Sequence, residues 1–304
     1  MLLYKYLPSC RSRFLNDRLI RFTQPGMFND PFDCLPAIAG YTAEKAKQQA
    51  NKVSLDMAMD LALGNFNDLD LEMTLKLLNR SAVDVSKQHA ADPSAQGLKL
   101  LAALQNRMRR DIGILCLCEN RQSILMWSHY AENHKGFLVG FESSDPFFSH
   151  RPDEPEEIGQ LTRVRYAKKR PSIHVDVIEN RGLIPDFLFS KNEDWSYERE
   201  WRVIRFLKNA SRTILNDVYL FEVPATAIRE IVLGANADSR LVEGLASAAR
   251  NPDLKHVKFS RADLSRTEYE MDIVPRDTPQ HFNEALAWLR TRDESRARPA
   301  GPLP

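Results

Sequence analysis

The amino-acid sequence predicts an α+β fold, in which a mixed, largely antiparallel sheet carries flanking helices and a helical insertion. Apolar runs of strand length occur at 112–118 and 136–141, and short runs of this kind are typical of buried strands. Between about 42 and 110, apolar residues instead recur at three- and four-residue steps, which indicates helix. We expect a single α+β domain over 1–290, with the helical insert at about 42–110 and a disordered tail at 291–304.

The elements follow in order along the chain. Residues 2–6 and 19–22 have strand character and enclose a short helical start, and the loop at 23–33 is rich in Pro, Gly, Asn and Asp, which favour turns. A helical segment at 126–131 separates the two apolar strands. Further strands are expected at 161–166, 198–206, 219–223 and 230–233, and a helix at 238–250.

Composition excludes several broad classes. Hydrophobic residues make up 43% of the 304-residue chain and charged residues 27%, and 42 basic against 41 acidic side chains give a net charge of +1. The chain can therefore bury a core, and its overall charge gives no reason to expect nucleic-acid or membrane-surface binding. No apolar stretch approaches the roughly 18 residues of a spanning helix, and the first residues lack the apolar core of a signal peptide. Only four cysteines are present, so we expect a cytoplasmic protein without a membrane partner.

The segment Phe28-Asn29-Asp30-Pro31-Phe32-Asp33 places two carboxylates and two aromatic rings around a proline. Pro31 restricts the backbone of Asp30, and Asn29 can bond its own backbone two residues on. One interpretation is a structural turn. The other is a preformed loop of an active site, in which Asn29 and Asp30 contact a substrate and the loop packs against the segment at 126–131.

The segment 123–132 predicts an amphipathic helix. At 100° per residue, Ile124, Trp127, Tyr130 and Ala131 share one side, whereas Leu125, Ser128, His129 and Glu132 share the other. The second face is either an ordinary solvated surface or a polar site with His129 as a catalytic base. His134 follows five residues later and points elsewhere on the wheel, so we expect no metal there.

The segment Trp195-Ser196-Tyr197-Glu198-Arg199-Glu200-Trp201-Arg202 carries the densest pattern of charges and rings. If a strand begins at Glu198, then Glu198, Glu200 and Arg202 lie on one face about 7 Å apart. The three residues form either a ladder of ion pairs or a catalytic pair of carboxylates tuned by an arginine. We predict that Glu200 is the principal catalytic residue.

Cys116 and Cys118 point to the same side of their predicted strand and are too far apart for a relaxed disulfide. Without a second ligand pair they make no zinc site, and we expect them to pack in the core. Phosphate-binding and dinucleotide-binding glycine loops, GxSxG and HExxH are absent from the sequence.

As a set, these segments resemble a bacterial family of unknown function. The family carries a YKY start, an FNDPFD loop, a CFSE strand, an MWSHYA..HKG segment and a W.YE.EWR strand. The corresponding residues here lie at 4–6, 28–33, 116–119, 126–136 and 195–202, so the resemblance spans about 2–235. Cys118 stands where the family more often has Ser or Thr.

More distantly, the layout is similar to that of ADP-ribosyltransferases. This resemblance implies that Tyr4, Lys5 and Tyr6 supply an early ribose-binding element and that Ser128, His129 and Tyr130 supply the middle element. Glu198 and Glu200 would be the catalytic glutamates on the late strand, with Arg202 beside them. NAD is then the expected substrate, no metal is expected, and the acceptor, a protein or nucleic acid, is open.

Three function classes follow. The first is an NAD-using ADP-ribosyltransferase or glycohydrolase in a phage-defence or toxin system. The second is a non-catalytic sensor or binding module of such a system. The third is a metal-dependent nuclease using Asp30, Asp33, Glu119 and His129. The sequence leaves the oligomeric state open.

Overall fold

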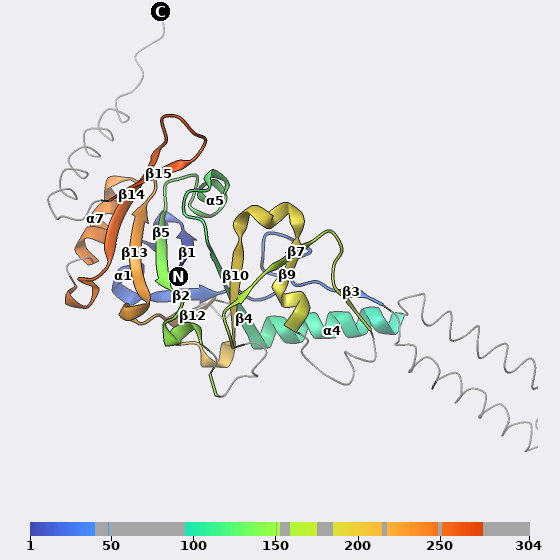
Figure 1. The fold of residues 1–304 in the computed structure, drawn as a ribbon. Helices are drawn as coiled ribbons and strands as arrows, with labels where there is room; N and C mark the ends of the chain where they lie inside the picture. The colour runs from blue at the N-terminus through green and yellow to red at the C-terminus, as the bar shows by residue number, and fades with distance from the viewer. Residues whose placement is uncertain are drawn as a thin grey trace, which may run out of the picture. The chain divides into compact units, whose positions relative to one another are not determined.

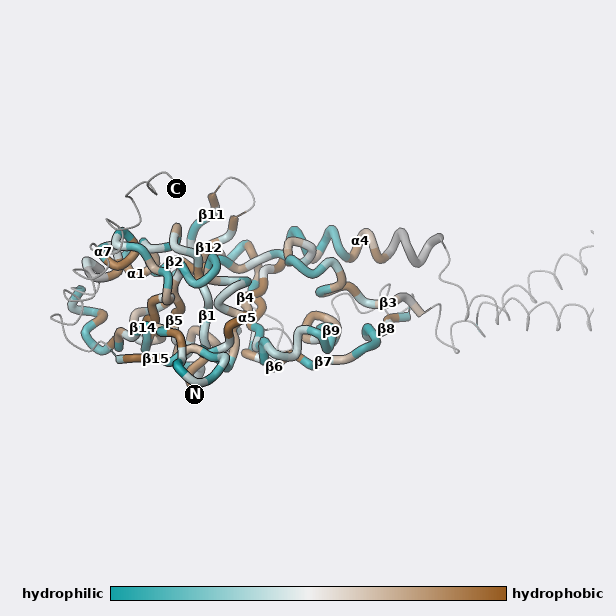
Figure 2. Tube along the Cα trace, turned by 90° about the horizontal axis from the view of Figure 1, so that it is seen from above, coloured by the Kyte–Doolittle hydropathy of each residue, from teal (hydrophilic) through white to brown (hydrophobic). Residues whose placement is uncertain are grey.

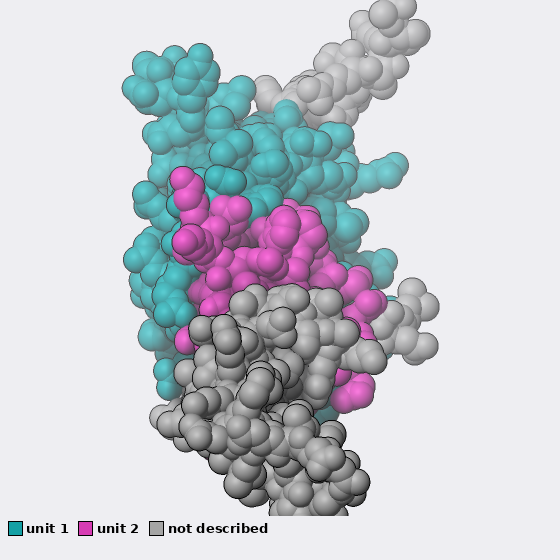
Figure 3. All heavy atoms as spheres, turned by 90° about the vertical axis from the view of Figure 1, so that its right-hand side faces the viewer, with its two compact units in different colours: residues 1–24, 111–166, 193–304 teal, residues 25–110, 167–192 magenta. Residues whose placement is uncertain are grey.

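A computed structural model of the protein describes residues 1–39, 48, 95–149, 151–152, 159–174, 185–214, 218–248 and 251–275. The chain divides into two compact units, coloured separately in Figure 3: residues 1–24, 111–166 and 193–304 make the first unit, and residues 25–110 and 167–192 the second. Most of the predicted insert, and all of the predicted tail, lie outside the described residues. The single-domain expectation stays a prediction.

The first unit contains an eight-stranded sheet in the order β15-β14-β13-β5-β1-β4-β10-β6 (Figure 1). Neighbouring strands are antiparallel except β13 and β14, which are parallel. This arrangement confirms the predicted α+β class with a mixed, largely antiparallel sheet. The strands are β1 Leu2–Leu7, β4 Ile112–Cys118, β5 Phe137–Glu142, β6 Thr162–Arg163, β10 Glu200–Phe206, β13 Ile228–Leu233, β14 Lys258–Leu264 and β15 Met271–Pro275.

The predicted membership of this sheet needs two corrections. Strand β2 (Leu19–Phe22) leaves it and forms a separate three-stranded sheet with β12 (Val218–Glu222) and β11 (Arg212–Ile214). Strands β14 and β15 join the large sheet although they lie beyond residue 235. Strand β15 is the edge strand and β14 is its neighbour, and both mix charged and apolar residues, so they lack the continuous apolar run that marks a central strand.

Strands β4 and β5 are apolar, apart from Glu142 at the end of β5, because both faces of the sheet are covered there. All of β4 except Cys116 is buried, as is β5 from Phe137 to Phe141, and the trace is brown, hydrophobic, along β5 in Figure 2. Glycine is required within β4, where a Cβ on Gly113 would come within 2.8 Å of Phe22. This close approach brings β2 onto β4, and a bridge joins Thr23 to Ile114.

Short helices complete the first unit. Helix α7 (Ser239–Ala248), predicted at 238–250, begins after Asp238, whose carboxylate accepts from the Leu241 amide at 2.8 Å. It packs against α1 (Phe14–Asp17), and α5 (Ile124–Tyr130) packs against β1. The 3₁₀ turns are η1 Ser9–Arg11, η2 Pro146–Phe148, η4 Glu193–Glu198, η5 Leu207–Asn209, η6 Ala225–Ala227 and η7 Pro252–Leu254.

The second unit contains helix α4 (Ala95–Asp111, its last residue in the first unit), which lies at the end of the predicted insert. It also contains the short strands β3 (Ala37–Ile38) and β8 (Ser172–Ile173), which are parallel. Turn η3 (Pro185–Phe189) buries three apolar side chains and leads into β9 (Ser190–Asn192). Strand β7 (Arg165–Ala167) carries the chain out of the first unit.

A buried arginine near the end of β10 holds two irregular segments of the first unit, the turn η2 with Ser149 and the chain at Gly159. Arg205 is 0% exposed, and its guanidinium donates to the carbonyls of Gly159 (2.7 Å), Phe147 (2.8 Å) and Ser149 (2.9 Å). A methionine of similar length would leave these carbonyls without their donor, so Arg205→Met should lower the free energy of unfolding by about 3 kcal/mol. The melting temperature should fall by roughly 6 to 12 °C.

The matched control is Arg229→Met, which removes an exposed arginine from β13 in the same unit. We expect it to leave the melting temperature within about 2 °C of the wild type, as is usual for surface changes. Equal losses in the two variants would show that the carbonyls around Arg205 do not need this donor.

Candidate functional site

Helix α5 carries the middle motif, and Trp127 fixes its orientation. The Trp127 side chain is 0% exposed, its Nε1 donates to the Arg121 carbonyl at 2.9 Å, and Tyr6 packs edge-on against it at 5.1 Å. Ser123 caps the helix by accepting from the Met126 amide. The predicted apolar face is partly wrong, because Ile124 is exposed, whereas Met126 and Trp127 are the buried residues. Because α5 has only seven residues, the packing of Met126 and Trp127 in the core determines its rotation, rather than a longer apolar face.

The predicted polar face of Ser128, His129 and Glu132 does not assemble. The helix ends at Tyr130, and Glu132, Asn133 and His134 have positive φ, so the helical wheel does not apply beyond it. Glu132 instead accepts from the backbone and the hydroxyl of Ser9, at 3.0 and 2.6 Å, and these bonds lower its pKa. The Ser128 Oγ lies 3.2 Å from Nε2 of His134 and donates to the Ile124 carbonyl.

The prediction of one strand from Glu198 onward is also wrong. Glu198 ends the 3₁₀ turn η4, Arg199 has a φ of 47°, and β10 begins at Glu200. The left-handed residue rotates the chain between the two glutamates, so the alternation of a strand does not relate them. Glu200 and Arg202 do share a face of β10.

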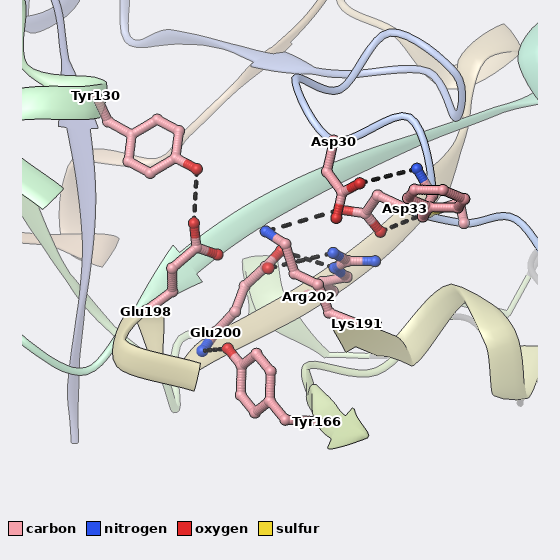
Figure 4. A network of polar contacts seen from close by, with 10 residues as sticks. Asp30, Asp33, Tyr130, Tyr166, Lys191, Glu198, Glu200 and Arg202 are labelled. Carbon is pink, nitrogen blue, oxygen red and sulfur yellow. Dashed lines mark hydrogen bonds and ion pairs between the residues drawn. The ribbon is translucent and has the colours of Figure 1, made fainter. Parts of the chain in front are cut away.

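Glu200 and Arg202 form a buried ion pair. The Arg202 Nε lies 2.7 Å from Oε1 of Glu200, Nη2 lies 3.2 Å from Oε2, and Arg202 is 0% exposed (Figure 4). The Glu200 amide donates to the hydroxyl of Tyr166 at 2.8 Å. Breaking such a pair is costly, because it leaves one buried charge uncompensated.

Glu198 contacts the middle motif directly. The hydroxyl of Tyr130 donates to Oε1 of Glu198 at 2.6 Å, as Figure 4 shows, and Glu198 is buried. The ring of the exposed His129 lies 6.1 Å from that of Tyr130 and 6.4 Å from that of Trp195, which in turn lies 6.1 Å from Tyr197. These five residues, His129, Tyr130, Trp195, Tyr197 and Glu198, are called the Tyr130 cluster below.

The early element, Tyr4 to Tyr6 on β1, mostly serves the sheet. The Tyr6 hydroxyl donates to the Asn120 carbonyl at 2.8 Å, and Lys5 donates to the Cys116 carbonyl at 3.0 Å. Burial raises the pKa of both Tyr4 and Tyr6. The Cys118 thiol points to the Asn120 carbonyl at 3.3 Å, and burial raises its pKa as well. It is therefore protonated at neutral pH.

The loop at 28–33 lies in the second unit. Asp30 is buried and its Oδ1 accepts from the Phe32 amide at 2.8 Å, so Asp30 itself makes an Asx turn. Asn29 is exposed. The expectation that this loop packs against the segment at 126–131 of the first unit stays a prediction.

Sequence reasoning missed a second polar cluster in the first unit. Arg121 Nη1 contacts both oxygens of Glu230, at 2.8 and 2.7 Å, and Ser260 donates to Glu230 Oε1 at 3.0 Å. Trp201 Nε1 likewise donates to Glu119 at 2.9 Å. The available signal was Glu230 itself, a carboxylate inside an otherwise apolar strand, since such a charge needs a partner.

Comparison with known proteins gives one match. The model of a family described as "Protein of unknown function (DUF2971)" matches residues 126–203. This segment contains the whole Tyr130 cluster together with Glu200 and Arg202, and it supports similarity to a family of unknown function. Searches of curated proteins and of solved structures found no match.

Two further findings concern the described residues. They contain no group of three or more His, Cys, Asp or Glu side chains able to hold a metal ion, so the nuclease interpretation gains no support from them. Within the same part of the chain, no helix is long and apolar enough to cross a membrane.

His134 makes the stability of the fold depend on pH. Partial burial lowers its pKa below the usual value of about 6.5. In the interval between the folded and unfolded pKa values the unfolded chain binds more protons, so protonation destabilises the fold as the pH falls. The difference in melting temperature between wild type and His134→Gln should be largest above about pH 6.5 and shrink towards pH 5. Thermal unfolding across this range measures it, and a difference that grows on acidification would contradict the assignment.

Proposed function

We propose that the protein binds NAD and breaks the bond between its ribose and nicotinamide, by hydrolysis or by transfer of ADP-ribose to a protein or nucleic-acid acceptor. The observation that carries the proposal is the 2.6 Å hydrogen bond from Tyr130 to Glu198. It joins the middle and late elements of the ADP-ribosyltransferase-like layout, and both residues lie in the segment that the family model matches. A role in defence or toxin systems belongs to the same proposal.

The aromatic residues of the Tyr130 cluster suit a ligand with flat rings. Trp195 and Tyr197 are half-buried and His129 is exposed, whereas Glu198 is buried. The cluster therefore leads from the surface to a carboxylate. Nicotinamide or adenine could stack on these rings, while ribose hydroxyls reach the Tyr130–Glu198 pair.

The chemistry requires charge stabilisation. When the C1′–N bond breaks, its electron pair goes to nicotinamide and positive charge develops on the ribose. The carboxylate of Glu198 would stabilise that charge. In hydrolysis, water adds to C1′ and its proton passes to a base such as His129, giving ADP-ribose, nicotinamide and a proton.

The geometry favours Glu198 over Glu200 for this role, which reverses the order expected from the sequence. Both oxygens of Glu200 already contact the guanidinium of Arg202, so this pair is suited to holding the start of β10. Glu198 instead accepts from a tyrosine hydroxyl, the kind of group that a ribose hydroxyl could replace. In this proposal Glu200 and Arg202 are positioning residues.

The test is nicotinamide release from NAD by the purified protein, with and without cell extract as a source of acceptors. Glu198→Gln should lower the rate at least about a hundredfold, the scale of losing one transition-state contact. Its melting temperature should change little. Glu200→Gln should instead lower the melting temperature, because it weakens a buried ion pair.

Glu268→Gln is the control, since Glu268 is exposed and distant in sequence from the Tyr130 cluster. It should match wild type in both measurements. The proposal fails if no nicotinamide is released under either condition, or if Glu198→Gln turns over NAD at the wild-type rate.

A second candidate is a non-catalytic binding module. It is favoured by the structural contacts that account for much of the late motif: Arg202 pairs with Glu200, and Trp201 bonds to Glu119. On this alternative the Tyr130 cluster binds a nucleotide without changing it. Saturable NAD binding with no nicotinamide release would select it.

A further inference from the structure

The second unit contains a cavity of about 190 Å³ that is lined by four cationic side chains: Lys168, Lys169, Arg170 and Lys191. All of its lining residues belong to this unit, and none of them is acidic. The remaining lining is uncharged and includes the ring of Phe32. Lys169 and Arg170 are adjacent in the chain and exposed, so their positive charges repel each other, and an anion that enters the cavity relieves this repulsion.

Two of the cations are held in place by neighbouring residues. The Arg170 guanidinium lies 5.4 Å from the centre of the Phe32 ring, an arrangement stabilised by cation–π attraction. Lys191 is 8% exposed, and its Nζ lies 3.8 Å from Oδ2 of Asp33 (Figure 4). Arg170 and Lys191 are therefore held by contacts within the second unit, whereas Lys168 and Lys169 are exposed at the mouth of the cavity.

The backbone around the cavity is also fixed. The Ala37 amide donates to the Pro171 carbonyl at 2.9 Å, and the Ala39 amide to the Ile173 carbonyl at 2.9 Å. These bonds continue the parallel pairing of β3 with β8. They tie the turn carrying residues 168–170 to the chain that follows Phe32.

The size and charge of the cavity indicate its ligand. Pockets that enclose a drug-sized molecule occupy about 300 to 1,000 Å³, so this one suits a compact group. Phosphate oxygens accept several charge-assisted hydrogen bonds from lysine and arginine at once. A nucleic-acid backbone would instead need a basic stripe that continues across the surface.

We propose that this cavity binds the phosphate group of a small organic phosphate. Lys169 and Arg170 contact the phosphate oxygens, and the ion pair of Lys191 with Asp33 fixes the buried side of the cavity. The site is independent of the chemistry proposed for the Tyr130 cluster, since every residue involved belongs to the second unit.

Calorimetric titration of the full chain with ribose 5-phosphate, and with inorganic phosphate, tests the proposal. Lys169→Gln/Arg170→Gln removes two exposed charges and should weaken binding about tenfold or more. The matched control Lys255→Gln/Lys258→Gln removes two exposed charges from the first unit. It should bind like wild type, and melting temperatures of both variants show whether they fold.

Saturable binding of ribose 5-phosphate that only the first variant loses supports the proposal. Tighter binding of ribose 5-phosphate than of inorganic phosphate assigns the site to an organic phosphate, whereas inorganic phosphate binding alone overturns that part. Absence of binding by either probe, equal loss in both variants, or binding only of a single-stranded oligonucleotide overturns the proposal. None of these results depends on NAD turnover, so this inference and the proposed function can fail separately.

Discussion

The pairing of β10 with β4 is the constraint on which the first unit depends. Seven consecutive residue pairs, from Glu200 opposite Cys118 to Phe206 opposite Ile112, set its register. Because side chains alternate along a strand, a slip of one residue would send Arg202 and the apolar Val203 to each other's faces. The ladder therefore decides where two buried cations, Arg202 and Arg205, meet their acceptors.

These buried arginines also explain how β10, with the segment at 195–202 that leads into it, stabilises the fold. Desolvating a guanidinium is unfavourable unless its donors are satisfied. Arg202 meets a carboxylate two residues away on its own strand, whereas Arg205 meets three carbonyls from segments distant in sequence. The first arrangement stabilises the start of β10, and the second fixes the loops that surround its end.

Apolar runs predicted the central strands, because a strand that is buried on both faces consists almost entirely of apolar residues. The α+β class and the sheet around β4 and β5 followed from these runs, and helix α7 was expected separately at 238–250. The edge strand β15 and its neighbour β14 were not predicted, since their mixed residues resemble a loop. For the candidate site, the sequence singled out Tyr130, His129 and Glu198 as residue types. Their grouping could not be predicted, because it depends on where α5 ends and on the left-handed conformation of Arg199. Glycine is the usual sequence signal for a helix end or a positive φ, and it stands at neither position.

The position of Arg199 between η4 and β10 has a consequence for how this region could diverge. A residue inserted into β10 would invert every side chain beyond it. One inserted before Arg199 would change only the turn that carries Trp195, Tyr197 and Glu198, while β10 keeps its register on β4. The chain can thus vary the rings and the carboxylate of the Tyr130 cluster independently of the buried charges two residues later. The left-handed conformation of Arg199 therefore lets the ligand-contacting residues change without a change in the pairing of β10 with β4.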